Sequence, residues 1–435
     1  MRKIIQYMMM ALIAVVLASC ANDISEESTP TVKSNIRFVV DDFPMFEKPS
    51  TRTIGEEDKG KTAWAVGDEI CVKLESKELG TQTATLKYNG VKFEIQDGNS
   101  LCYLDGEPVT AYAYYAPNRR WLNDGNLGYK DGEHDGTAEF LEATCTVHYG
   151  DDNYVDISFA NATRNYSRLR IATIPKTEIK VDADNFAPTD NPNLLYMTYT
   201  LTSDEKGNAY LYGTFDNNSI VTVKYRGASL ATHKFSKKTE NAKSYALDAT
   251  VVSLADEGLT FDQIVEDVKK ELYAGKTYIN LILAPDVDEE TLEAINIGLK
   301  DARDGSINLT LIGCKKIPSR GFLHFDMLKS IVLPDVTEIE ENAFSDCSGL
   351  QKVVLGNLTK VYGNVRENGI FDGLDTKYID LVLSKDQKAM NDGEAEGRYC
   401  WTADIITDYD LSNEHVSKKF LGYEFKSITC RYKFE

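Results

Sequence analysis

The chain has 435 residues, which is enough for about three domains with a hydrophobic core each. Its 68 Asp and Glu residues against 48 Lys and Arg residues give a formal net charge of −20 at pH 7. Because nucleic acids and anionic lipid headgroups attract basic surfaces, this charge argues against either of them being bound by electrostatic attraction.

The first residues have the pattern of an export signal, which we expect to cover residues 1–19. Arg2 and Lys3 form a short positive start, and an unbroken apolar run follows from Met8 to Ala18. This run is well short of the roughly 20 apolar residues that span a bilayer, so it predicts a secretory signal and not a membrane helix.

The end of this segment suggests a lipid anchor. Ala18 and Ser19 directly precede Cys20, and the arrangement resembles the lipobox of bacterial lipoproteins. The resemblance implies cleavage before Cys20 and acylation of that cysteine, so that the mature chain would be held in the membrane by lipid. The alternative is an ordinary signal cut near the same place, with Cys20 left as a spare thiol.

Residues 20–34 are polar and are expected to be a tether between the lipid and the folded body. The acidic residues Asp23, Glu26 and Glu27 resemble the signal by which gut and oral anaerobes send lipoproteins to the cell surface. We therefore predict an outer membrane lipoprotein that is exposed at the cell surface.

From Ile36 to Val252 the chain is rich in short runs of β-branched and aromatic residues. Asn89-Gly90 lies between two of these runs and predicts a β-hairpin, because both positions tolerate positive φ. The pattern predicts two successive β-sandwiches, over residues 35–150 and 151–253. The predicted strands are Ile36–Val40, Glu69–Leu74, Ala84–Tyr88, Val91–Ile95, Val109–Tyr115, Thr144–Tyr149, Tyr154–Ala160, Leu169–Ile174, Leu194–Leu201, Ala209–Phe215, Ile220–Tyr225 and Tyr245–Val252.

Three segments of this region resemble the markers of fimbrillin-like (Mfa-like) bacterial surface lipoproteins, and the match covers roughly residues 35 to 253. The segments are Trp64–Ile70, Ala111–Pro117 and Ser167–Ile171. A structural role accounts for each of them: Trp64 is expected to plug the core, and Tyr112 and Tyr114 are expected to share one face of a strand.

Residues 254–395 begin with two predicted helices. Apolar residues at helical spacing run from Phe261 to Leu272, after a capping box formed by Thr260 and Gln263. A second helix is expected to open at Asp288 and to close near Gly305.

A 22-residue repeat follows the helices. Phe322 and Phe344 are 22 residues apart, and Phe371 arrives five residues late, which indicates an insertion in the third unit. The other equivalent positions are Leu309, Ile331 and Val353; Leu311, Leu333 and Leu355; and Ile317, Ile339 and Val361. This period predicts stacked leucine-rich-repeat units that share one continuous core.

The segments Leu328–Pro334 and Ile339–Leu350 closely resemble the BspA-type leucine-rich repeat of bacterial surface antigens. Residues 396–435 are expected to cap the open end of the repeats. The predicted fold is therefore mainly β with a smaller α+β part: two tandem β-sandwich domains followed by a short leucine-rich-repeat solenoid.

The cysteines are expected to be buried packing residues. None of them forms a CxxC pair, so zinc is not expected. Cys347 occupies an apolar repeat position, three residues after Phe344. Cys400 with Cys430 is one disulfide that an exported chain could form.

No segment predicts catalytic chemistry, a cofactor or a metal site. Gly227–Ala231 approaches a nucleophile elbow but lacks its final glycine. Asp182–Asn185 opens like a calcium loop, but Ala187 and Asn193 stand where Gly and Glu are needed. We expect that the protein is not an enzyme.

Three functions stay open. The first is adhesion or protein–protein interaction, with a fimbrillin-like stalk presenting the repeat domain to a host or bacterial surface protein and Cys20 as the membrane anchor. The second is a fimbrial tip or anchor subunit assembled by strand donation, with proteolysis near Arg52, as the resemblance implies. The third is a glycan-binding lipoprotein of a nutrient-uptake system, for which Trp121 and Tyr129 are the candidate contacts.

Overall fold

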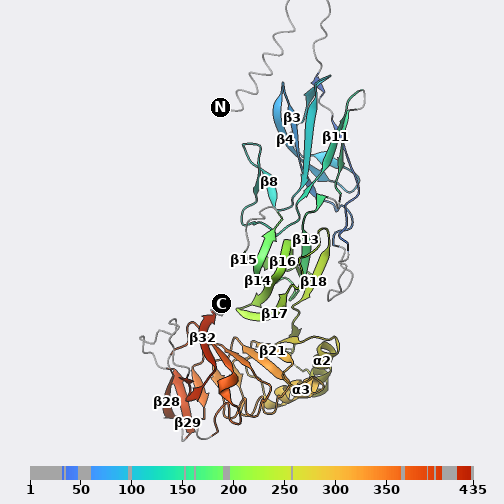
Figure 1. Ribbon diagram of the computed structural model, residues 1–435. Coiled ribbons are helices and arrows are strands. Elements are labelled where there is room, and N and C mark those ends of the chain that lie inside the picture. Colours follow the sequence, from blue (N-terminus) through green and yellow to red (C-terminus); the bar gives the residue numbers. More distant parts are fainter. Residues whose placement is uncertain are drawn as a thin grey trace, which may run out of the picture.

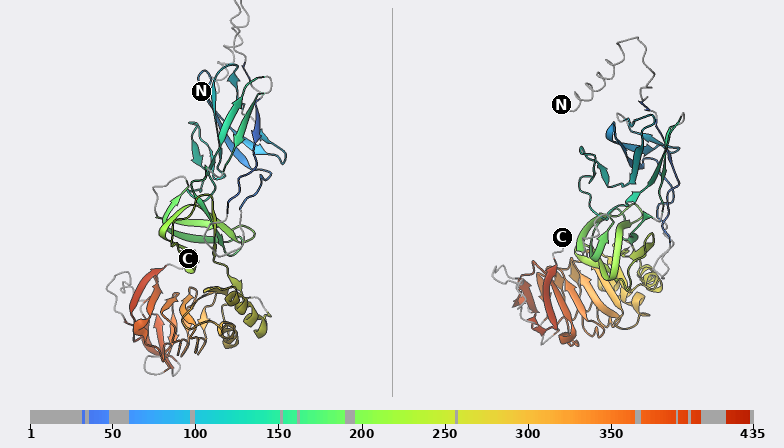
Figure 2. Two further views of the ribbon diagram at one scale, coloured as in Figure 1. Left: turned by 45° about the vertical axis from the view of Figure 1, so that its right-hand side comes forward. Right: turned by 45° about the horizontal axis from the view of Figure 1, so that its top comes forward.

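The computed structural model describes residues 32–33, 36–47, 60–96, 100–150, 153–160, 163–189, 196–255, 258–363, 368–388, 390–395, 398–403 and 419–432. The chain is mainly β, as predicted, and its strands form three groups that follow one another along the molecule (Figure 1, Figure 2). We name these groups the first, second and third domains by their hydrophobic cores, which run from Ile36 to Tyr166, from Leu169 to Ala249 and from Leu254 to Phe425. Cys20 and Arg52 lie outside the described residues.

The first domain consists of two sheets that contribute side chains to one core. The strand orders are β10-β7-β3-β4-β5 and β11-β12-β2, and β2 is parallel to β12 whereas the other pairs are antiparallel. The strands are β2 (Arg37–Val40), β3 (Glu69–Ser76), β4 (Gly80–Tyr88), β5 (Phe93–Ile95), β7 (Val109–Tyr115), β10 (Leu141–Glu142), β11 (Thr144–His148) and β12 (Tyr154–Ser158). Two short pairs are added by β1 (Val32–Lys33) with β6 (Tyr103–Leu104), and by β8 (Arg119–Trp121) with β9 (Leu127–Tyr129).

Trp64 lies at the open side of this core and is half-buried. Its ring meets those of Phe43 and Phe93 at nearly right angles, with centroids 4.9 and 5.0 Å away. The indole N–H donates to the carbonyl of Asp41 at 2.8 Å. Edge-to-face contacts of this kind stabilise aromatic clusters beyond the area that they bury, so Trp64 packs the core as predicted.

Tyr112 and Tyr114 share one face of β7, and it is the face opposite to the core. Ala113 and Tyr115 are the residues of this strand that are buried in the core. The ring of Tyr114 instead contacts that of Trp121, with centroids 6.3 Å apart.

The hairpin predicted at Asn89-Gly90 is present, but its second strand begins two residues later than predicted. Tyr88 pairs with Phe93, and four residues connect them. The Asn89 side chain accepts a hydrogen bond from the N–H of Val91 at 2.9 Å, and Gly90 has a φ of 101°. This local turn leaves Val91 in the loop, where it is 86% exposed.

The second domain is a single sheet by its hydrogen bonds, with the order β15-β14-β16-β13-β18 and with β17 also paired to β16. The first part of β16 pairs with β13 and its last part with β17. One core collects side chains from both parts, so the two halves of the sheet face each other across it. The strands are β13 (Ser167–Ala172), β14 (Glu178–Pro188), β15 (Tyr196–Thr202), β16 (Asn208–Tyr225), β17 (Ala228–Lys234) and β18 (Ser244–Asp248).

The segment considered as a calcium loop is a strand. Asp182–Asn185 lies within β14, which is hydrogen-bonded to β15 on one side and β16 on the other. Asp182 forms an ion pair with Lys224 of β16. A strand bonded on both sides cannot wrap around an ion, so this segment is not a calcium-binding loop.

The segment that approaches a nucleophile elbow, Gly227–Ala231, does not have the structure of one. Ser229 lies at the start of β17, where it pairs with Lys224. Arg226 and Gly227, with φ values of 47° and 80°, form a tight turn between two antiparallel strands. An elbow needs a strand-to-helix turn, and here the chain returns as a strand.

The third domain is built on a seven-stranded sheet in which all neighbours are parallel, in the order β19-β20-β21-β23-β25-β27-β32. A second sheet has the order β22-β24-β26-β29-β28. The strands are β19 (Val252–Ser253), β20 (Tyr278–Ile282), β21 (Ile307–Ile312), β22 (Lys316–Ile317), β23 (Leu328–Leu333), β24 (Glu338–Ile339), β25 (Lys352–Leu355), β26 (Lys360–Tyr362), β27 (Asp380–Ser384), β28 (Met390–Ala395), β29 (Arg398–Ala403) and β32 (Ser427–Tyr432). The remaining elements are α2 (Phe261–Tyr273), α3 (Glu289–Leu299), η3 (Thr376–Tyr378), β30 (Lys419–Phe420) and β31 (Tyr423–Glu424).

Both helices begin at the predicted caps. The Thr260 side chain accepts from the N–H of Gln263, and the Gln263 side chain accepts from the N–H of Thr260 at 2.8 Å. Asp288 caps α3 through its carboxylate. Helix α3 ends at Leu299 and not near Gly305, because a tighter turn follows Leu299.

The predicted 22-residue period is the register of the parallel sheet. Leu309 pairs with Ile331, and Ile331 pairs with Val353. The second sheet keeps the same step between β22, β24 and β26. Successive coils therefore stack, and their apolar residues form one core.

Three phenylalanines form a column through this core. The rings of Phe322 and Phe344 are stacked with centroids 5.2 Å apart, and those of Phe344 and Phe371 with centroids 5.3 Å apart. The insertion before Phe371 is therefore accommodated without loss of the stack. Cys347 lies in the same core at 1% exposure, and burial raises the pKa of its thiol to about 12. Cys347 is a packing residue, as predicted.

The last described strands extend both sheets. β32 is parallel to β27 and forms the last strand of the large sheet, while β29 runs antiparallel to β26 and forms a hairpin with β28.

We expect Phe344→Ala to lower the free energy of unfolding of the third domain by about 3–5 kcal/mol, because it removes a fully buried ring from the middle of the stack and leaves a cavity. Hydrogen exchange of β23 and β25 in denaturant measures this change. The matched control is Tyr378→Ala, which removes an aromatic side chain that is 72% exposed and should change stability by less than about 0.5 kcal/mol. Equal effects of the two variants would contradict the stacked core.

Candidate binding site between the second and third domains

The free edge of β17 lies against the parallel sheet of the third domain (Figure 1). The Asn280 side-chain amide donates to the backbone carbonyls of Leu230 at 2.9 Å and Thr250 at 3.1 Å. The Thr310 hydroxyl donates to the carbonyl of Ser229 at 3.4 Å. Side chains of the parallel sheet thus bond directly to backbone carbonyls of β17.

A cluster of charges fixes the same junction. The Lys276 ammonium donates to the hydroxyl of Thr250 at 2.6 Å and forms ion pairs with Glu271 at 2.5 Å and Asp248 at 3.0 Å. Burial alone would lower the pKa of Lys276, but its bonds to Glu271 and Asp248 raise that pKa above its ordinary value. Ile312 of β21 adds apolar contact, because it belongs to the core of the second domain.

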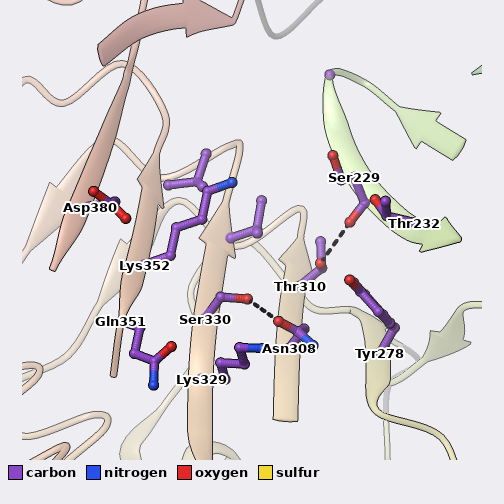
Figure 3. A pocket seen from close by; sticks show the side chains of 13 residues that line it. Ser229, Thr232, Tyr278, Asn308, Thr310, Lys329, Ser330, Gln351, Lys352 and Asp380 are labelled. Carbon is purple, nitrogen blue, oxygen red and sulfur yellow. Dashed lines mark hydrogen bonds between the residues drawn. The ribbon is translucent and has the colours of Figure 1, made fainter. Parts of the chain in front are cut away.

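A pocket of about 350 Å³ lies between β17 and the outward face of the parallel sheet (Figure 3). Its floor is a row of polar side chains on five neighbouring strands, which we call the polar row. The members of the polar row pair with one another in the sheet and are Tyr278, Asn308, Ser330, Lys352 and Asp380. Ser229 and Thr232 of β17 form one side of the pocket, and Lys329 and Gln351 lie at the start of the strands.

Internal hydrogen bonds hold part of this surface. The Ser330 hydroxyl donates to the Asn308 side chain at 2.7 Å. Asp380 accepts from Ser427 at 2.6 Å and from Lys426 at 2.9 Å. Burial alone would raise the pKa of Asp380, but these two bonds, with Lys426 and Lys352 nearby, lower that pKa. Asp380 is therefore an ionised carboxylate that is already bound.

Unlike Asp380, the two lysines of the pocket are open to a ligand. Lys329 and Lys352 are exposed, and neither forms an ion pair or side-chain hydrogen bond with the described residues. The side chains of Gln351 and Tyr278 also have no hydrogen-bond partner among the described residues. The pocket therefore offers two cations and several hydrogen-bonding groups, while its one carboxylate is engaged.

The glycan contacts suggested by the sequence do not form a platform. The Trp121 indole N–H donates to the carbonyl of Ala84 at 2.9 Å, which holds the ring on β4. Tyr129 lies on the partner strand β9, where the Arg119 guanidinium stacks 4.4 Å from its ring centroid and its hydroxyl donates to Asp135. Both rings are half-buried by packing within the first domain.

Cys400 is a free, buried thiol, so the disulfide considered between Cys400 and Cys430 is not formed. Burial raises the pKa of the Cys314 thiol to about 12, and that of Cys71 to about 11. These thiols are protonated at neutral pH and do not supply nucleophiles.

A second groove, of about 760 Å³, opens between the sheet edges β2 and β5 of the first domain. Its apolar floor includes Phe38, Trp64 and Phe93. The N–H of Arg37 donates to Asn153, directly before β12, and that of Asp41 donates to Ile157 of β12, so the N–H groups of Phe38 and Val40 point to the opposite, open side.

Within the described ranges, no group of three or more His, Cys, Asp or Glu side chains is placed to hold a metal ion. No helix of those ranges combines the length and the apolar character needed to cross a bilayer.

Sequence reasoning missed the pocket, although a signal for part of it was present. Asn308, Ser330 and Lys352 are 22 residues apart, and each lies next to a core position of the repeat. A polar residue at the same position of every unit indicates an outward row on the sheet. The place of Ser229 in the pocket could not be predicted in this way, because it depends on how β17 packs against the third domain.

No protein-family model matches the chain, and no curated protein matches its sequence. Among solved structures, a candidate cell adhesion protein of Bacteroides fragilis aligns with 9% identity over 49% of this chain and 92% of its own, with a TM-score of 0.26. A variant of the shaft pilin SpaA of Lactobacillus rhamnosus aligns with 12% identity over 51% of this chain and 98% of its own, with a TM-score of 0.18. Likenesses this distant carry no conclusion about fold or function.

We expect Asn280→Asp to destabilise the junction by about 1–3 kcal/mol at pH 7, because it replaces a donor to two buried carbonyls by a carboxylate of the same shape. Burial beside two carbonyls raises the pKa of the new carboxyl, so the loss grows as pH rises through its unfolded value near 4 and shrinks as pH falls. Thermal unfolding at pH 4 and pH 7 measures the difference. A loss that does not depend on pH would contradict this role of Asn280, and Asn308→Asp, at a half-exposed site, is the control.

Proposed function

We propose that this chain is a cell-surface lipoprotein whose first two domains form a stalk and whose third domain presents the pocket to a partner outside the cell. The observation that carries the proposal is the linear order of the three domains, with the pocket at the junction of the second and third, away from the first (Figure 1, Figure 2). A lipid on Cys20 would attach the chain on the side of the first domain, so a partner would meet the third domain from outside.

The junction of the first two domains supports a stiff stalk. Arg164 and Glu139 form a fully buried ion pair, and the Arg164 guanidinium lies 4.0 Å from the ring centroid of Phe46. Glu47 then bonds to the second domain, since its N–H donates to the carbonyl of Ala242 at 2.9 Å and its carbonyl accepts from Ser244 at 3.0 Å. The ion pair holds the end of the first domain, and the two backbone bonds of Glu47 tie that end to the second domain, which favours one arrangement of the two.

In this proposal the third domain is a BspA-type leucine-rich-repeat unit. The parallel pairing at a 22-residue step, the stacked phenylalanines and the shared core support that assignment. Its outward face is the part of a repeat domain that is free to bind, because the inward residues are used in the core. The protein is proposed to act by binding and not by catalysis.

The anchor is tested with Cys20→Ser in cells that express the full chain. The wild type should incorporate labelled palmitate, fractionate with the outer membrane and be degraded by protease added to intact cells. The variant should lose the label and the membrane association, because no other lipid acceptor is proposed. A labelled variant, or a wild type protected from protease, would contradict the surface lipoprotein.

Adhesion is tested in the same cells. The soluble chain from residue 21 onward should compete with the bacteria for binding to mucosal cells or neighbouring bacteria, and removal of the anchor should abolish attachment of the cells. Unchanged attachment of cells that carry Cys20→Ser would argue against an adhesin.

The groove between β2 and β5 favours a second function, that of a fimbrial tip or anchor subunit that accepts a strand from a neighbouring subunit. Two open edges and an apolar floor are the features that an added strand needs. The C-terminal strand β32 is already paired with β27 and is not available for donation. With a groove that can accept a strand and with β32 held in its own sheet, the described part of the chain suits the end of a filament better than its shaft.

Electron microscopy of fimbriae from cells that express the gold-labelled chain tests this second function. Gold should lie at filament ends, and Val40→Pro should remove it, because proline deletes the open N–H on the groove side without deleting one that β12 uses. The matched control Val40→Ala keeps the N–H and should keep the gold. Gold along the shaft, or ends that remain labelled with proline, would refute strand acceptance.

A further inference from the structure

We propose that the pocket between β17 and the polar row binds a carboxylate-bearing sugar. This inference rests on the proposed function, because it names the ligand class of the same surface. Three features of the pocket lead to it: two lysines that form no ion pair with the described residues, a floor of hydrogen-bonding side chains, and strands under the pocket that are paired on both sides.

The charged side chains in and around the pocket favour an anionic ligand. Three lysines outside the pocket are neutralised by carboxylates: Lys276 by Asp248 and Glu271, Lys377 by Glu424 at 3.7 Å, and Lys426 by Asp380 at 2.9 Å. Lys329 and Lys352, which line the pocket, form no ion pair within the described part of the chain, although Lys352 lies beside Asp380 in the sheet register. The one carboxylate among the lining residues, Asp380, already accepts from Lys426 and Ser427, so a ligand that carries a carboxylate would pair with the two lysines.

The rest of the pocket suits hydroxyl groups. Gln351 and the Tyr278 hydroxyl have no partner among the described side chains, and the Ser330 hydroxyl keeps its acceptor positions after donating to Asn308. The half-buried ring of Tyr278 gives one apolar surface at the end of the polar row (Figure 3). A volume of about 350 Å³ is at the small end of ligand pockets and fits a short oligosaccharide segment better than a folded partner.

An extended acidic peptide is the alternative ligand, and the geometry disfavours it. Peptides that bind to sheets gain most of their affinity from main-chain hydrogen bonds to an open edge. The strands under the pocket are paired on both sides, and the carbonyls of Ser229 and Leu230 at the edge of β17 already accept from Thr310 and Asn280. A peptide would have side-chain contacts alone.

The test uses the soluble chain from residue 21 onward and two sugars of equal length. Isothermal titration with a hyaluronan tetrasaccharide, which carries carboxylates and no sulfate, should show saturable binding, and the neutral chitotetraose should bind at least ten-fold more weakly. The double variant Lys329→Gln with Lys352→Gln should lose at least ten-fold in affinity for the acidic sugar, because each of the two substitutions removes one charge-assisted contact.

The control variant is Lys377→Gln, which removes a lysine of η3, just before β27, that is paired with Glu424 and lies outside the pocket. It should bind like the wild type, and all variants should unfold at the wild-type temperature because the lysines are exposed. Equal binding of both sugars, unchanged affinity in the double variant, or binding of a tetraglutamate peptide but of neither sugar would overturn the proposal.

The failure of this inference is separable from that of the proposed function. If the cells attach and the anchor is required, but no acidic sugar binds, then the adhesin stands and its ligand is of another class. If attachment itself does not depend on the anchor, the proposed function fails whatever the pocket binds.

Discussion

The contact on which the rest of the molecule depends is the docking of β17 on the parallel sheet. An unpaired strand edge exposes backbone groups that attract other chains, and proteins cover such edges in several ways. Here the amide of Asn280 and the hydroxyl of Thr310 take the open carbonyls of β17, and Ile312 enters the core of the second domain. The same contact closes one side of the pocket, so the junction and the site are one feature.

Side chains on the outward face of the parallel sheet can bind a ligand, because those on its inward face are packed in the core of the third domain. In each coil the residues that point inward are committed to the core, and the phenylalanine column fixes their spacing. The turn after each ring is fixed as well: His324, Asp346 and Gly373, each two residues after a phenylalanine, all have positive φ. Asn308, Ser330 and Lys352 contribute little to this packing, so their chemistry can change without loss of the fold.

The period of the third domain could be predicted because each coil contacts its neighbours at a constant spacing along the chain. The paired residues Leu309, Ile331 and Val353 repeat the same apolar character at the same step, and the sheet register follows directly. The start of helix α2 could be predicted for a similar reason, since Thr260 and Gln263 form their capping hydrogen bonds with each other within one turn.

Strands β14 and β17 could not be predicted in the same way. In β14 the charged residues Asp182 and Asp184 alternate with Val181 and the small Ala183, and the strand carries a register shift near Asn185, where φ is 51°. The two acids made this segment resemble a loop, because the lysine that pairs with Asp182, Lys224, comes from a strand some 40 residues away. The pocket could not be predicted from the sequence, because one of its sides is formed by β17. The polar row could have been predicted from the 22-residue repeat.

A strongly acidic chain can still bind an anion, and the reason is the short range of electrostatics in salt. At physiological ionic strength the screening length is about 8 Å, so charges on the first domain contribute almost nothing at the pocket. The groups within that distance decide the binding: Lys329 and Lys352 form no ion pair in the described part of the chain, and the negative charge of Asp380 is already opposed by Lys426. The net charge of −20 governs how the whole protein meets a charged surface, whereas the local pairing of a few side chains decides which ligand the pocket can hold.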